Sequence, residues 1–141
     1  MPDQIRAGDL IALAAIIIGF GSTIISFRIQ REIAMDEKNE RLWVPWADWL
    51  ILLAIGLSAA FVVLLLAKVT PIRTAFAAAA GAAAIVLEVG YIPSILAHYR
   101  IWFGKNRTGQ RDRGEPAEIV CVMLTVTVAV IAFAFVHCQQ H

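Results

Sequence analysis

The sequence predicts an all-α integral membrane protein built as a bundle of four transmembrane helices. Hydrophobic residues make up 60% of the 141 residues and charged residues 16%, whereas apolar residues make up about 45–50% of a typical soluble domain. The excess lies in four long apolar segments, and a helix needs about 20 mostly apolar residues to cross a bilayer. Because these segments and their flanks use nearly the whole chain, we treat residues 1–141 as one domain. We expect the four spans over residues 8–28, 46–67, 74–99 and 117–137.

Small and hydroxyl residues form a stripe along the first span. They recur at alternating spacings of four and three residues, at Gly8, Ala12, Ala15, Gly19, Ser22 and Ser26. This period places them on one face of a helix, and small residues let membrane helices approach closely. We interpret the stripe as a packing seam within the bundle, and a water- or ion-lined face is the alternative.

The segment after the first span, residues 28–45, is charged but balanced. Opposite charges stand four residues apart in two pairs, Arg28 with Glu32 and Glu37 with Arg41. Such pairs stabilise a helix by about 0.2–0.5 kcal/mol each. One apolar ridge also continues into the segment, through Ile25, Ile29 and Ile33. The first helix is therefore predicted to extend two or three turns beyond the membrane, into the cytoplasm.

Tryptophans mark the start of the second span. Pro45 suits the beginning of a helix, where its missing N–H costs little. Trp43, Trp46 and Trp49 bracket this start, and tryptophan is enriched where a membrane meets water. We interpret the three as an interfacial aromatic belt rather than a ligand-stacking cage. Ser58 is the only hydroxyl residue within the span.

The third span carries the most unusual side chain of the sequence. Glu88 lies near its middle, and Pro93 follows five residues later. An acidic residue at the centre of a membrane helix costs about 2.5–3.5 kcal/mol on an insertion scale, and such residues face protein or water. Three interpretations stay open: a protonated structural glutamate, an ion or proton site, and a contact for another membrane protein.

The other helices bring small or hydroxyl residues to the depth of Glu88. At 1.5 Å of rise per residue, Gly19, Ser58 and Thr125 reach a similar level, and Tyr91 shares the helix face of Glu88. The predicted intramembrane polar site consists of Glu88, Tyr91, Ser58, Thr125, Gly19 and Ser22.

The distribution of basic residues predicts the orientation. Nine of the twelve Lys and Arg residues lie on the side of the 28–45 and 100–116 loops. Basic residues favour the cytoplasmic side, so we expect both loops to be cytoplasmic and both termini to lie outside, in a bacterial inner membrane. The second loop carries Arg100, Lys105, Arg107, Arg111 and Arg113. These residues set the topology, or alternatively dock on anionic lipid head groups.

No motif in the sequence indicates an enzyme, a cofactor or nucleic-acid binding. A phosphate-binding glycine pattern, HExxH and CxxC are all lacking, and a net charge of +1 does not favour nucleic acid. His137, Cys138 and His141 are metal-ligand types, but a zinc site uses three or four protein ligands. We therefore expect no catalytic residues, no cofactor and no metal.

Two functions from different classes fit these observations. The first is a homo-oligomeric channel or transporter-like conduit in which Glu88 faces a polar pathway, because spare small-residue faces favour self-association. The alternative is a membrane anchor or effector subunit whose 28–45 and 100–116 loops bind a soluble protein partner.

Overall fold

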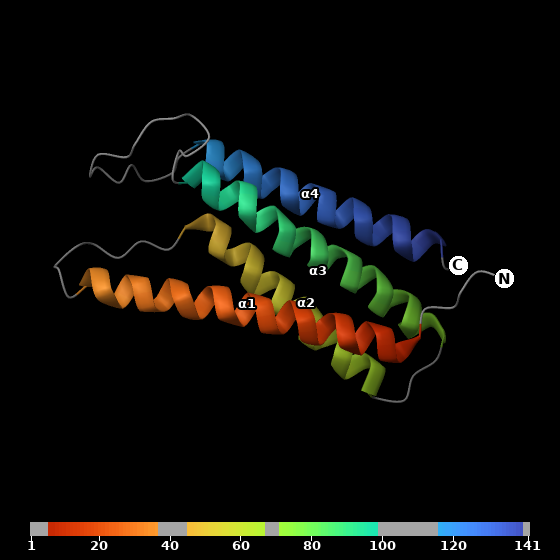
Figure 1. Ribbon diagram of the computed structural model, residues 1–141. Coiled ribbons are helices and arrows are strands. Elements are labelled where there is room, and N and C mark those ends of the chain that lie inside the picture. The colour runs from red at the N-terminus through yellow and green to blue at the C-terminus, as the bar shows by residue number, and fades with distance from the viewer. Residues whose placement is uncertain (1–5, 37–44, 67–70, 99–115, 140–141) are drawn as a thin grey trace.

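The structure, a computed structural model, is all-helical over the residues that it describes, which are 6–36, 45–66, 71–98 and 116–139. Four helices follow one another along the chain: α1 (Ala7–Asp36), α2 (Trp46–Leu66), α3 (Pro71–His98) and α4 (Pro116–Gln139) (Figure 1). Each of the four is long and apolar enough to cross a membrane. This finding confirms the four-helix prediction.

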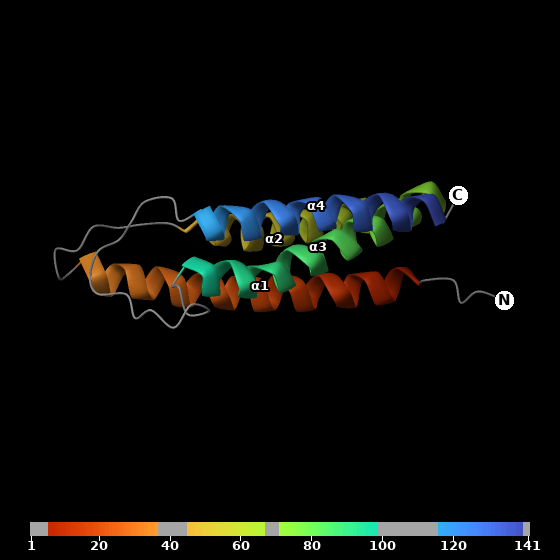
Figure 2. The same cartoon turned by 90° about the horizontal axis from the view of Figure 1, so that it is seen from above.

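The helices run up and down in one elongated bundle. The first residue of α1, the last of α2, the first of α3 and the last of α4 lie at the same end, and the opposite helix ends lie together at the other (Figures 1 and 2). At that second end α1 reaches past the other three helices in both views. We call this end the loop end, because the 37–44 and 99–115 segments connect there; both segments lie outside the described residues.

One helix boundary agrees with expectation and another differs from it. The predicted extension of the first helix is present, since α1 continues without a break to Asp36, about two turns past Arg28. The third helix begins at Pro71 rather than at residue 74. Pro71 lies outside the predicted span 74–99, but proline is well suited to the first helical position, where no intrahelical partner for its nitrogen is required. Pro93 lies inside α3 and does not end it.

The alanine-rich helix α3 occupies the centre of the bundle. In its Thr74–His98 window 61% of the residues are buried, compared with 22% in α1, 39% in α2 and 11% in α4. Helix α3 contacts all three other helices, whereas α1 and α4 make no contact with each other among the described residues. Small side chains suit a central helix because they let several neighbours approach its backbone.

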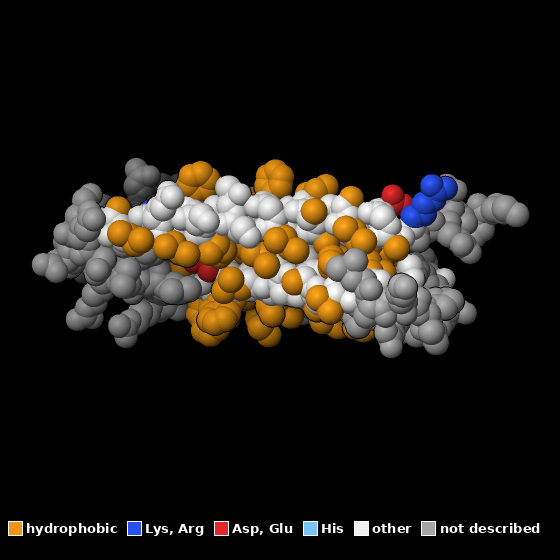
Figure 3. Space-filling view, turned by 90° about the horizontal axis from the view of Figure 1, so that it is seen from below, with side chains coloured by type: hydrophobic (Ala, Val, Ile, Leu, Met, Phe, Trp, Pro, Cys, Tyr) orange, Lys and Arg blue, Asp and Glu red, His pale blue; other side chains and the backbone are white. Residues whose placement is uncertain are grey.

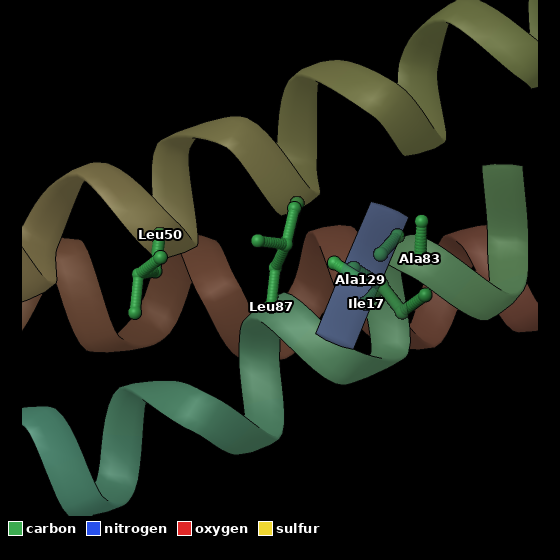
Figure 4. Close-up of a cluster of buried hydrophobic side chains, with 7 residues drawn as sticks. Ile17, Leu50, Ala83, Leu87 and Ala129 are labelled. Carbon is green, nitrogen blue, oxygen red and sulfur yellow. The ribbon is translucent and has the colours of Figure 1, made fainter. Parts of the chain in front are cut away.

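The core at mid-bundle joins all four helices. Ile17 of α1, Leu50 of α2, Leu87 of α3 and Ala129 of α4 belong to one buried cluster (Figure 4). Close packing also explains particular glycines. A Cβ atom added at Gly21 would lie 2.8 Å from Ile55 of α2, and one added at Gly90 would collide with Thr125 of α4.

The small-residue stripe of α1 faces out of the bundle, so its interpretation as an internal packing seam is wrong. All six of its residues, from Gly8 to Ser26, are exposed. The bundle instead receives the opposite face of α1, with Leu10, Ala14, Ile17 and Gly21. That face combines large apolar side chains with a glycine, and so it fills space against α2 and α3 better than a uniformly small face does.

The outer surface between the two ends of the molecule is apolar. In Figure 3 hydrophobic and uncharged atoms cover the middle of the described surface, and coloured Lys, Arg, Asp and Glu atoms are seen only toward its ends. Large exposed side chains such as Phe20, Leu53, Val89 and Met123 contribute to it. A contiguous apolar surface of this length is the kind that lipid covers in membrane proteins.

Candidate functional site

Glu88 lies at mid-length on α3, at the edge of the side that faces α1. On this side Gly81 packs against Leu13 of α1 and Phe61 of α2, and Tyr91 belongs to a cluster that α1 contacts through Ile24 and Ile25. Glu88 falls between these two contacts along α3 and is only half-buried. Its Oε1 atom is nevertheless buried and has no hydrogen-bond partner among the described residues.

The structure places the predicted companions of Glu88 on several helices and faces. Tyr91 is buried, 8% exposed, beside Ala47 and Ile51 of α2. Thr125 is buried against Gly90, and two residues along a helix separate side chains onto nearly opposite faces. Ser58 is fully buried on α2, and its hydroxyl finds no hydrogen-bond partner among the described residues.

The remaining predicted site residues lie farther out. Gly19 and Ser22 are exposed on the outer face of α1. Of the predicted aromatic belt, Trp46 and Trp49 are both more than half exposed at the start of α2, while Trp43 is outside the described residues. The basic loop residues, from Arg100 to Arg113, are also outside them.

A second polar group lies at the loop end, and its centre is Glu118 in the first turn of α4. Glu118 is fully buried. One carboxyl oxygen, Oε2, is hydrogen-bonded to His98 Nδ1 of α3 at 2.7 Å. The other, Oε1, accepts a hydrogen bond of 3.0 Å from the backbone N–H of Ala47 in α2. One carboxyl group therefore joins three helices.

An ion pair extends this polar group to α1. Arg28 Nε donates a hydrogen bond of 3.3 Å to Asp48 Oδ2, and both side chains are about nine-tenths buried, with exposures of 11% and 9%. Asp48 also lies in the first turn of α2, beside Ala47. We call Arg28, Asp48, His98 and Glu118 the loop-end network; it takes one residue from each helix.

The positions of these residues on their helices explain why the network is stable. The first N–H groups of a helix have no intrahelical partner and carry partial positive charge. Glu118 satisfies such a group at the start of α2 and itself lies at the start of α4. His98 lies in the last turn of α3, where the partial negative charge favours a cationic or donating ring.

The sequence contained a signal for this network that pattern reading missed. Each apolar segment has a charged or titratable residue at its loop end. The contacts between these ends are not evident from the sequence, because 20 residues separate Arg28 from Asp48 and 71 separate Ala47 from Glu118. Alternating helix directions bring these ends to one level. The predicted intramembrane polar site contains none of the four residues of the loop-end network.

Metal-ligand chemistry is limited in the described part of the chain. There, no three His, Cys, Asp or Glu side chains are grouped so as to hold a metal ion. His137 stacks on Phe133 with ring centroids 5.9 Å apart, and Cys121 and Cys138 are free thiols. His141, the other histidine of the tail, is outside the described residues.

Comparison with known proteins adds no relative: no protein-family model, curated protein or solved structure shows a significant match to the chain. The function is therefore inferred from the chemistry of Glu88 and of the loop-end network.

Proposed function

We propose that this protein is an integral membrane homo-oligomer that conducts small cations or protons along a polar pathway that includes Glu88. The observation that carries the proposal is that the Glu88 carboxyl group has a buried oxygen without a hydrogen-bond partner among the described residues. The side chain sits at mid-length of an apolar helix and is half-buried.

Such a carboxyl group destabilises the protein unless a hydrogen-bond donor or a cation contacts its buried oxygen. A buried polar atom without a hydrogen bond costs about 1–3 kcal/mol, and lipid offers no hydrogen bonds. Glu118, by contrast, has both of its carboxyl oxygens hydrogen-bonded within the fold. Water or a cation in a pathway supplies what Glu88 lacks within one chain.

The pathway is proposed to form between copies of the chain. On the ridge that holds Glu88, the neighbouring residues Ala84 and Tyr91 are buried inside the bundle, whereas Glu88 is half-buried; the exposed part of its side chain is therefore proposed to border space outside the chain. A second copy would close that space against lipid. The proposed orientation has the loop end in the cytoplasm of a bacterium, because the 28–45 and 100–116 segments hold nine of the twelve basic residues.

Flux measurement in liposomes tests this function. We expect wild-type protein to carry a cation or proton flux across the liposome membrane. Glu88→Gln keeps the size and much of the hydrogen-bonding capacity, so it should abolish the flux and leave the oligomer mass unchanged. Glu88→Asp should retain part of the flux. Equal flux in wild type and Glu88→Gln, or none in either, would contradict the proposal.

A second candidate function, a membrane anchor that presents its loop-end segments to a soluble protein, is favoured by the loop-end network. Ala47, His98 and Glu118 lie at the roots of the two connecting segments, and their hydrogen bonds hold these roots together. Under this alternative, replacing residues 100–115 with a Gly/Ser linker removes partner capture from native membranes, whereas Glu88→Gln leaves capture unchanged. The opposite pattern would exclude it.

A further inference from the structure

The outer face of α1 carries a repeat that continues beyond its small-residue stripe. After Ser26 the same spacing leads to Ile29 and then to Ile33, so eight residues follow one another at intervals of 4, 3, 4, 3, 4, 3 and 4. We call these eight residues the α1 seam: Gly8, Ala12, Ala15, Gly19, Ser22, Ser26, Ile29 and Ile33. All eight are exposed. A mean spacing of 3.5 residues, kept over this length, is the heptad repeat of a left-handed coiled coil.

The residue type along the seam changes where the surroundings change. From Gly8 to Ser26, within the apolar part of α1, the seam is made of glycine, alanine and serine, which permit close helix packing in lipid. Beyond Arg28, where α1 projects past the other helices (Figures 1 and 2), it is made of isoleucine. Ile29 and Ile33 are 54% and 56% exposed, and in water their burial is favourable.

The fold of one chain does not account for the seam. A Cβ atom added at Gly8 or at Gly19 would meet nothing within 4 Å, in contrast to Gly21 on the opposite face. Among the described residues, α1 contacts α2 and α3 but not α4. No described helix of the same chain therefore covers the outer face of α1. Small residues at these positions are therefore not required by packing within one chain.

We propose that the α1 seam binds the α1 seam of a second copy, as a parallel two-stranded coiled coil over residues 8–33. Two copies in one membrane share the same orientation, so a two-fold axis along the membrane normal places each seam residue beside its own counterpart at the same depth. Small residues then meet small residues, and isoleucines meet isoleucines. The inference rests on the homo-oligomeric part of the proposed function and is independent of conduction.

The residues that flank the seam are compatible with this pairing. In the heptad they are the positions next to the contact, namely Asp9, Ile11, Ile16, Ile18, Thr23, Ile25, Gln30 and Glu32. The six between Asp9 and Glu32 are uncharged, so like charges would approach each other only at the two ends of the contact. Arg28, which lies between Ser26 and Ile29 of the seam, is paired with Asp48 inside its own chain. Lipid could cover the small-residue part of the seam, but it does not account for isoleucines repeating in phase beyond it.

Disulfide cross-linking of adjacent position pairs tests the proposal. In a background with Cys121→Ala and Cys138→Ser, single cysteines are introduced on the seam as Gly19→Cys or Ser26→Cys. The matched controls are their neighbours Phe20→Cys and Phe27→Cys, which are also exposed, 68% and 67%. After oxidation in membranes we expect covalent dimers from the seam positions and few from the controls. Equal yields at both kinds of position, or no dimer from the seam, would overturn the proposal.

A substitution pair separates the seam from the fold. Gly19→Leu enlarges the seam where one chain has open space, so it should weaken dimerisation roughly tenfold, measured by single-molecule photobleaching in liposomes, with unchanged monomer stability. Gly21→Leu is the control, because it should destabilise the monomer itself. An oligomer that is detected by its mass but gives no cross-link at the seam positions would contradict only the proposed contact through the α1 seam. A 15.4 kDa monomer in all lipids tested would overturn both the seam and the homo-oligomer of the proposed function.

Discussion

Glu88 and Glu118 are both glutamates in apolar helices, but their surroundings differ completely. Glu118 is fully buried, and both of its carboxyl oxygens have partners, His98 and the N–H of Ala47. Glu88 is half-buried, and its buried Oε1 has none among the described residues. The difference follows from position along the helix. Helix ends expose backbone N–H groups that a carboxylate can bind, whereas in mid-helix these groups are already used.

This comparison separates stability from function. The hydrogen bonds of Glu118 hold the ends of α2, α3 and α4 together, so its contribution lies in the fold. Glu88 contributes no hydrogen bond from Oε1 to the described structure, so the fold gains little from it. A side chain that is unfavourable in its own chain is a candidate for function.

The largest effect is expected from removing the Glu118 carboxyl group. Glu118→Ala removes the buried carboxyl group that binds His98 and accepts the hydrogen bond of the Ala47 N–H, and breaking a buried pair in this way costs about 3–5 kcal/mol. The free energy of unfolding, measured by SDS titration of protein in mild detergent micelles, should fall by that amount. Glu118→Gln, which keeps one carbonyl oxygen for Ala47, should lose clearly less. A Glu118→Ala variant as stable as wild type would contradict the structural role.

An intermediate effect is expected from the ion pair of the same network. Arg28→Leu removes one hydrogen bond and leaves Asp48 buried, at a cost of about 1–3 kcal/mol. The double variant Arg28→Leu, Asp48→Leu removes both charges and should recover part of that loss, because two apolar side chains replace a buried pair. Unfolding of wild type, Arg28→Leu, Asp48→Leu and the double variant under the same conditions measures the coupling. Additive losses would show that the two side chains do not interact.

The smallest effect on stability is expected at Glu88. Glu88→Leu removes an unpartnered polar atom from an apolar setting, so the free energy of unfolding should stay within about 1 kcal/mol of wild type or rise. The same SDS titration checks this, with Glu118→Leu as the matched control that should be strongly destabilised. A loss at Glu88 as large as that at Glu118 would mean that Glu88 has a structural partner.

Sequence reasoning succeeded where a signal is local and failed where it depends on distant residues. Helix positions, the continuation of α1 to Asp36 and the apolar surface all follow from runs of neighbouring residues. The stripe of α1 could be placed on one face by its period, but a period does not tell whether that face points into its own bundle. The loop-end network could not be assembled without the fold, because its hydrogen bonds link helices 20 to 71 residues apart in sequence.

The most direct test of the functional role of Glu88 is its accessibility to water. In the background with Cys121→Ala and Cys138→Ser, Glu88→Cys and Val89→Cys are each treated in membranes with a small, charged, water-soluble thiol reagent. Val89 is the matched control, since it lies at the same depth and is 59% exposed on the apolar surface. A polar pathway at Glu88 predicts fast labelling of Glu88→Cys and little labelling of Val89→Cys. Equal labelling at both positions, or no labelling at position 88, would contradict the pathway.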